Sequence, residues 1–157
     1  MIRDTSKRDA DGLHIAILGS GSAAFAAALH AANAGARISL IEHGTVGGTC
    51  VNIGCVPSKI LIRAAHVAHL QAQHPFSGIS RQRPIVDRGA LVAQQQARVD
   101  ELRQAKYANL LETNSNITLI RGHAHFKDGN TLAVTGSEGN EKIVHADRIL
   151  IATGRRP

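Results

Sequence analysis

The stretch "LHIAILGSGSAAFAAALHAANAGARISLIE", residues 13–42, decides the fold of this chain. Its first six residues form a short apolar run of the kind found in buried strands, and the run ends at Gly19. An alanine-rich segment of strong helix formers follows, with Gly35 at the position where a helix usually stops. "RISLIE" is then typical of a second strand that ends at Glu42. Strand, glycine turn, helix and strand predict a βαβ unit, and hence an α/β fold.

The turn inside this unit carries Gly19-x-Gly21-x-x-Ala24, the spacing of a dinucleotide-binding loop. Gly19 would permit the tight turn, Gly21 would let a pyrophosphate approach the backbone, and Ala24 would keep the helix close to the strand. Glu42 ends the next strand, where an acid would bind ribose hydroxyls. The motif alone is weak evidence, and a glycine turn without a ligand is the structural alternative. It does not separate FAD from NAD, although the acid argues against a 2′-phosphate at this site.

The next segment, "GGTCVNIGCVPSK" at residues 47–59, holds both cysteines of the chain, Cys50 and Cys55. Five residues of α-helix rise ~7.5 Å. The Cα atoms of a disulfide lie no more than about 7 Å apart, so a bridge here requires a distorted helix. Gly54 and Pro57 would supply that distortion. A bridge over so short a loop removes little chain entropy and is easily reduced when strained, which favours redox chemistry over a structural role.

Other interpretations of the cysteines stay open. Zinc would need about four ligands, and His66 and His69 could add two to the thiols. Two unrelated buried cysteines are the remaining alternative. Thr49 is expected to cap a helix that begins at Cys50, and a thiol in the first turn of a helix has its thiolate favoured.

The rest of the chain is expected to form two further helices, over residues 58–73 and 87–114. Beyond them, short alternating segments are separated by the turn clusters "KDGN" and "SEGN". The strands expected there are "NITLIRGHAHF" (116–126), "TLAVTG" (131–136) and "KIVHA" (142–146), and "DRILIATG" (147–154) is expected to close the chain as a buried strand.

Length and composition limit the possible functions. The 157 residues, 43% hydrophobic, suit one globular domain over 13–157 after a polar tail at 1–12. The net charge of +6 comes from scattered basic residues, and with 3% aromatic residues it fits phosphate binding better than nucleic acid. No apolar run could span a bilayer, and the first residues lack the apolar core of a signal peptide. We expect a cytoplasmic protein with neither membrane nor nucleic acid as a partner.

Taken together, "GSGSAAFAAA", Glu42, the cysteine segment and "ILIATG" resemble the flavin-dependent pyridine nucleotide–disulfide oxidoreductases. The resemblance covers nearly all of the chain after the first dozen residues. It implies an incomplete Rossmann-like FAD-binding domain, three-layered, with a parallel sheet and a small antiparallel β-meander. The FAD-binding residues that it implies are Gly19, Gly21, Ala24, Glu42, Gly44, Thr49, Lys59, Ala124, Thr153 and Gly154. Lys59 would lie near the isoalloxazine ring, and Ala124 would contact the adenine end through its backbone.

The resemblance also implies a redox reaction at Cys50 and Cys55. Electrons would pass from NADPH to FAD and then to a disulfide between them, with Cys55 facing the flavin and Cys50 exchanging with the substrate. "IRAAHVAHL" and "LVAQQQARVDELRQAKY" resemble the mercury-reducing branch of the family, in which the reduced pair would transiently hold Hg(II). A dihydrolipoamide dehydrogenase or a glutathione reductase-like enzyme, with a small disulfide as substrate, is the alternative.

The NAD(P)H, central and dimerisation domains of the family have no counterpart in these residues. Two interpretations are consistent with the lack of these domains. The chain is the N-terminal portion of a homodimeric enzyme, inactive alone and weak in FAD binding, or it is a stand-alone module that binds FAD or a metal through its thiols.

Overall fold

The computed structural model describes residues 12–154, so all of the expected polar tail except Gly12 lies outside the described residues. The helices and strands follow one another as β1 (His14–Leu18), α1 (Ser22–Asn33), β2 (Arg37–Glu42), α2 (Gly48–Asn52), α3 (Cys55–Ala72), α4 (Arg88–Arg103), the π-helical turn η1 (Gln104–Ala108), α5 (Asn109–Thr113), β3 (Ile117–Arg121), β4 (His123–Phe126), β5 (Thr131–Thr135), β6 (Glu141–His145) and β7 (Arg148–Ile151).

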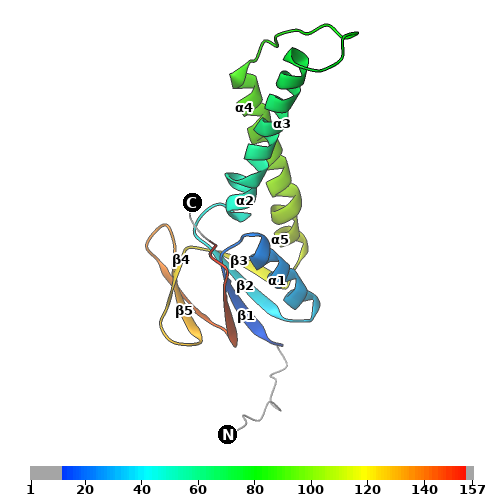
Figure 1. Cartoon of the computed structure of the whole chain (residues 1–157). Helices are drawn as coiled ribbons and strands as arrows, with labels where there is room; N and C mark the ends of the chain where they lie inside the picture. Colours follow the sequence, from blue (N-terminus) through cyan, green and yellow to red (C-terminus); the bar gives the residue numbers. More distant parts are fainter. Residues whose placement is uncertain (1–11, 155–157) are drawn as a thin grey trace.

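The larger sheet consists of four parallel strands in the order β3-β2-β1-β7 (Figure 1). The predicted βαβ unit is confirmed, since β1 and β2 are adjacent and α1 connects them. Gly35 follows the end of α1 with a φ of 89°, so the predicted helix stop is also confirmed. The carboxyl ends of β1 and β2 therefore lie at the same edge as the glycine loop, where open α/β sheets bind their ligands.

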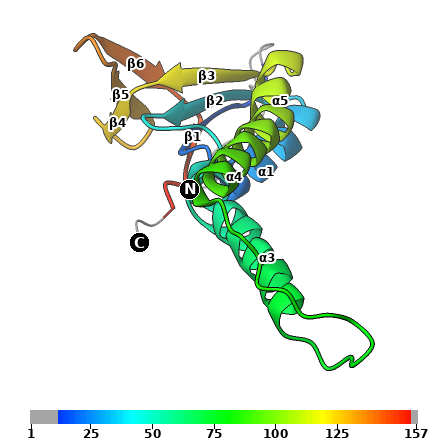
Figure 2. The same cartoon turned by 90° about the horizontal axis from the view of Figure 1, so that it is seen from above.

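This sheet is covered on both faces, which makes the three layers that were expected (Figure 2). Ile17 of β1 points to a core that includes Phe25 and Ala28 of α1 and Tyr107 of η1. Its neighbour Leu18 points the other way, into a second core. That second core is completed by residues of the smaller antiparallel sheet, β4-β5-β6, among them Leu132, Val134 and Val144.

A pair of helices, α3 and α4, projects from this body as an arm (Figure 1). None of the α3 side chains is buried, and Ile62 is 66% exposed. The two long helices expected from the sequence are confirmed, although the second is interrupted by η1 and continues as α5. No helix among residues 12–154 is long and apolar enough to cross a membrane.

Two expectations about the strands were wrong. Residues 116–126 form two strands rather than one, because the chain turns at Gly122, so β3 joins the parallel sheet and β4 joins the antiparallel one. β7 is an edge strand rather than a buried one, with Ile151 64% exposed. Its apolar sequence gives it a place beside β1, but nothing among the described residues covers its other edge.

Candidate functional site

The glycine loop lies between β1 and α1. A Cβ on Gly19 would come within 2.4 Å of the carbonyl oxygen of Ala152, so this turn packs against the chain where it leaves β7. Gly21 is the N-cap of α1, and no side chain caps the helix there. A Cβ on Gly21 would have no heavy atom nearer than 3.9 Å. Ala24 is fully buried against the sheet. The loop therefore presents a helix N-terminus without a side-chain cap, which is a favourable place for an anion.

Glu42 is held firmly at the end of β2. One carboxylate oxygen accepts from the amide and the hydroxyl of Ser20 at 3.0 and 2.7 Å, and the other accepts from the amide of Gly44 at 2.7 Å. Burial alone would raise the pKa of Glu42, but the Ser20 hydroxyl, the Gly44 amide and the neighbouring His43 outweigh it and lower that pKa. The residue is therefore an anion at neutral pH, and its carboxylate orientation is fixed.

A pocket of ≈ 310 Å³ opens at this edge of the sheet. Five of the predicted cofactor-binding residues line it together, namely Gly19, Glu42, Ala124, Thr153 and Gly154. The remaining lining residues are Leu18, Ile41, His43, Gly122 and His123. The sequence reasoning missed His43 and His123, whose rings meet edge to face with centroids 5.5 Å apart. In the sequence, the one feature that could have indicated these histidines is that each is adjacent to a predicted site residue.

The two cysteines lie on two separate helices. Cys50 is in α2, Cys55 is the first residue of α3, and both thiols are free and exposed. The expected distortion is a complete break at Ile53 and Gly54 rather than a bend. A Cβ on Gly54 would lie 2.9 Å from the carbonyl oxygen of Thr49 and 3.3 Å from the Cα of Cys50, so only glycine lets the chain fold back so closely.

Pro57 does not bend the helix, contrary to expectation. It is the third residue of α3, in the first turn, where the missing N–H would have no helical partner. Its ring is therefore accommodated without breaking a hydrogen bond. Gly54 alone provides the close approach between the segments that carry the two cysteines.

The expected cap by Thr49 was also wrong. α2 begins at Gly48 with Gly47 as its N-cap, and no side chain caps it. The expected stabilisation of the Cys50 thiolate is contradicted as well, because the pKa of Cys50 is raised. The main cause is the hydrogen bond between its thiol and Cys55, with burial and the charge of a nearby Cys55 thiolate adding to it. Cys50 therefore keeps its proton more readily than an isolated thiol does.

The glycine loop and the cysteine segment touch each other directly. The amide of Gly47 donates to the carbonyl oxygen of Ser20 at 3.0 Å. Gly48, with a φ of 70°, is so close to the loop that a Cβ on it would lie 2.8 Å from the Cα of Gly21. Two motifs that are separate in the sequence thus form one continuous backbone surface.

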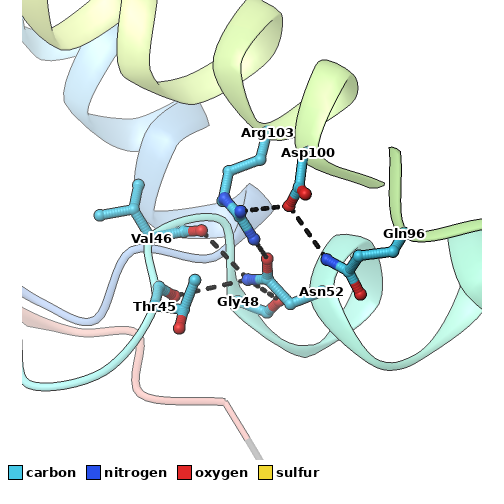
Figure 3. Close-up of polar contacts among 7 residues, drawn as sticks. All are labelled: Thr45, Val46, Gly48, Asn52, Gln96, Asp100 and Arg103. Atoms are coloured by element: carbon cyan, nitrogen blue, oxygen red, sulfur yellow. Dashed lines mark hydrogen bonds and ion pairs between the residues drawn. The ribbon is translucent and has the colours of Figure 1, made fainter. Parts of the chain in front are cut away.

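Asn52, which the sequence reasoning passed over, connects this surface to the arm (Figure 3). Its side-chain amide donates to the carbonyl oxygens of Val46 and Gly48 at 3.0 and 2.9 Å, and its oxygen accepts from Arg103 at 3.0 Å. Arg103 also forms an ion pair with Asp100. Only the position of Asn52 between the two cysteines could have drawn attention to it.

Of the other predicted residues, Thr49 lies on α2, Lys59 on α3 and Gly44 in the loop after β2. Thr49 and Lys59 are exposed, and Lys59 is one turn beyond Cys55. The zinc alternative receives no support, since residues 12–154 contain no group of three or more possible metal ligands. His66 pairs with Arg63 instead, at 2.9 Å. Gly44 lies beside Glu42 and accepts at its carbonyl oxygen from Arg121 at 2.7 Å.

Comparison with known proteins agrees with this arrangement. Residues 13–157 match the pyridine nucleotide-disulphide oxidoreductase family. The chain is 57% identical over 156 residues to a mercuric reductase of Shigella flexneri and 46% identical over 147 residues to one of Lysinibacillus sphaericus. These alignments cover 99% and 94% of the chain but only 28% and 26% of the two relatives.

The fold is also similar to that of a solved structure. The HOCl-induced flavoprotein disulfide reductase RclA of Escherichia coli superposes with a TM-score of 0.73 at 30% identity. The match covers 92% of this chain and 28% of RclA, so here too the chain spans a little over a quarter of its relative. The chain belongs to the pyridine nucleotide-disulphide oxidoreductase family.

Proposed function

We propose that this chain is the FAD-binding, redox-active-disulfide portion of a mercury(II) reductase. The observation that supports the proposal is the backbone contact between Gly21 and Gly48, because the glycine loop, which we propose binds the cofactor, lies against the segment that carries the two cysteines. The names of the relatives at 46% and 57% identity support mercury as the substrate.

The residues present fit a dinucleotide. The uncapped N-terminus of α1, where Gly21 has no side chain to obstruct the backbone, suits the pyrophosphate. Glu42 is an oriented anion with further acceptor capacity for ribose hydroxyls. The pocket at Ala124 and Thr153 has the size of a small-ligand site and would take the adenine end. Bound there, FAD would supply two-electron transfer from NADPH to the cysteine pair.

The remaining predicted FAD residues would act as follows. Gly19 and Ala24 would hold the turn and the helix in place, and Gly154 would close over the cofactor together with Thr153. Gly44 would fix the Glu42 carboxylate through its amide. Thr49 and Lys59 would line the flavin side of the site.

The cysteine pair would exchange electrons with the substrate. Reduction of a Cys50–Cys55 disulfide takes two electrons and two protons and gives two thiols. Hg(II) would replace the two thiol protons and bind as a dithiolate, which suits the preference of a soft ion for sulfur. Two further electrons would then reduce Hg(II) to Hg(0) and return two thiolates. As the family resemblance implies, Cys50 would be the exchanging thiol, reacting once it has lost its proton, and Cys55 would face the cofactor.

We further propose that the chain, as residues 13–157, is the first segment of an FAD domain in a longer, cytoplasmic homodimer. The domains that bind NADPH and form the dimer would belong to that longer protein. The coverage of about a quarter of each relative supports this arrangement.

The test is mercury-dependent oxidation of NADPH by the longer protein that contains this chain. We expect NADPH consumption to depend on Hg(II), to require FAD, and to be lost in Cys55→Ser. Matched reactions would receive dihydrolipoamide with NAD⁺, or glutathione disulfide with NADPH, in place of Hg(II). Turnover with either of these and no response to mercury would contradict the mercury assignment while leaving the family role intact.

A further inference from the structure

Two side chains of helix α4 donate hydrogen bonds to the cysteine segment, one on each side of the break at Ile53 and Gly54. The first contact joins Arg103 to Asn52, the last residue of α2 (Figure 3). The second joins the side-chain amide of Gln95 to the carbonyl oxygen of Pro57 in the first turn of α3, at 2.8 Å. A single rigid helix therefore holds both helices that carry the cysteines.

The Asn52 contact is well suited to hold α2 in one place. Its Nδ2 donates to the carbonyl oxygens of Val46 and Gly48, and lies 3.5 Å from that of Thr45. Its Oδ1 is left to accept from Arg103. Every polar atom of this side chain is thus engaged, which fixes both the loop that leads into α2 and the end of the helix.

Arg103 is oriented before it reaches Asn52. Its other terminal nitrogen pairs with Asp100 one turn back on α4, and Asp100 also accepts from Gln96 at 3.0 Å (Figure 3). The Arg103 side chain is 32% exposed, so the contact with Asn52 is partly shielded from water. A preorganised, charge-assisted hydrogen bond of this kind is stronger than one between neutral groups.

From these contacts we infer that Asn52, Arg103 and Gln95 are positioning residues, which hold Cys50 and Cys55 close together in the dithiol state. A disulfide keeps the two helices together covalently, whereas the dithiol needs the contacts with α4. Removing one of these hydrogen bonds increases the conformational freedom of the dithiol more than that of the disulfide. The equilibrium between the two forms therefore shifts from the disulfide toward the dithiol. The inference rests on the proposed redox role of the cysteines but needs no bound flavin.

The experiment is a thiol–disulfide equilibrium of the full chain with glutathione. One glutathione disulfide oxidises the two thiols to one disulfide and leaves as two glutathione thiols, so electrons and protons balance. The ratio of the two forms is read by alkylation and mass spectrometry after acid quenching. In Arg103→Met we expect the equilibrium constant for disulfide formation to fall roughly tenfold, about the value of one charged hydrogen bond. That is a rise of ~30 mV in reduction potential.

Arg98→Met is the matched control. Arg98 is on the same helix and carries the same charge, but within residues 12–154 it pairs only with Glu101, at 2.6 Å, and is 60% exposed. We expect its equilibrium constant to stay within about twofold of the wild type, since exposed pairs contribute little. Gln95→Met should lower the constant by roughly threefold, as expected for one neutral hydrogen bond.

Different results of this experiment contradict the positioning role of the α4 residues and the proposed redox function. If Arg103→Met and Gln95→Met both match Arg98→Met, the inference is overturned even though the cysteines form a disulfide. If circular dichroism finds Arg103→Met unfolded, Gln95→Met alone decides the question in the same way. If wild-type Cys50 and Cys55 form no internal disulfide at any glutathione ratio, the proposed redox function fails with the inference.

Discussion

The sheet body and the helical arm differ in how much of each is buried. In the body, Leu40 of β2 and Ala28 of α1 have no exposed surface. In the arm, α3 has no buried residue, and Leu70 is 45% exposed. The body is therefore held by apolar packing from both faces of a sheet. The inner end of the arm is tied to the cysteine segment by hydrogen bonds such as Gln95 to Pro57.

The cysteines lie where these two regions meet. Gly48 packs against the glycine loop of the body, and Asn52 is bonded to α4 of the arm. The cysteine segment, residues 47–59, is thus the junction of body and arm and is fixed on both sides, and Val51 of α2 packs into the core of the body. In the proposed function, the body would supply the cofactor platform, and the junction would hold the pair of thiols beside it.

The largest effect should be the loss of stability when a leucine of the body is truncated, compared with a leucine of the arm. Leu40→Ala leaves a cavity between β2 and the helix layer and should cost about 2–5 kcal/mol of unfolding free energy. Leu70→Ala removes a partly exposed side chain and should cost less than about 1 kcal/mol. Urea denaturation of the two variants measures both. Equal losses would mean that the arm is as well packed as the body.

A second effect should arise at the junction. Gly48→Ala places a Cβ 2.8 Å from the Cα of Gly21, at a φ of 70° that alanine rarely adopts. We expect a loss of about 1–3 kcal/mol and weaker flavin binding, measured by denaturation and by flavin fluorescence. Gly78→Ala is the control, because Gly78 has open space around it. If the two alanine variants bind flavin equally well, the contact between the motifs does not matter for the cofactor.

A smaller effect is the pH dependence that Glu42 gives to the body. The pKa of Glu42 is lowered in the folded chain, so its contribution to stability is present above the ordinary glutamate pKa. That contribution should disappear as the pH falls through the folded pKa. Unfolding free energies measured from neutral to acidic pH should therefore fall more for the wild type than for Glu42→Gln. Parallel curves would show that the Ser20 and Gly44 contacts do not stabilise the anion.

The smallest effect concerns the thiol of Cys50. Its raised pKa should return toward the ordinary value in Cys55→Ala, because the hydrogen bond and the neighbouring charge are then gone. More thiolate at neutral pH should make Cys50 react with iodoacetamide several-fold faster, roughly in proportion to the thiolate fraction. Rates measured from pH 7 to 10 give the pKa directly. A Cys50 rate that is unchanged or slower in Cys55→Ala would contradict this coupling.

The body could be predicted from sequence because its elements are local. The apolar run before Gly19, the alanine-rich helix and the stop at Gly35 each follow from a few neighbouring residues. The same reasoning gave the glycine loop and Glu42, since their spacing fixes their place at one edge of the sheet. It failed at β7, because an apolar strand has the same sequence whether a neighbour covers it or not.

The junction could be predicted only in part. The need for a distortion between Cys50 and Cys55 follows from helix geometry, but the choice between Gly54 and Pro57 depends on which helix each residue joins. The contact of Asn52 with Arg103 spans 51 positions in the chain, and no local pattern indicates it. The cap at Thr49 failed for a similar reason, since Gly47 occupies that place through its contact with the body.

The central claim is that the glycine loop and the cysteine pair form one redox site. The most direct test is titration of the FAD-loaded chain, freed of unbound FAD, with dithionite to two electrons per chain, so that the disulfide is reduced and the flavin stays oxidised. Absorption is then measured at long wavelength, where a thiolate beside an oxidised flavin absorbs. We predict the band in the wild type and in Cys50→Ser, and its loss in Cys55→Ser. Stable FAD binding without the band, or a band that persists in Cys55→Ser and is lost in Cys50→Ser, would contradict the claim.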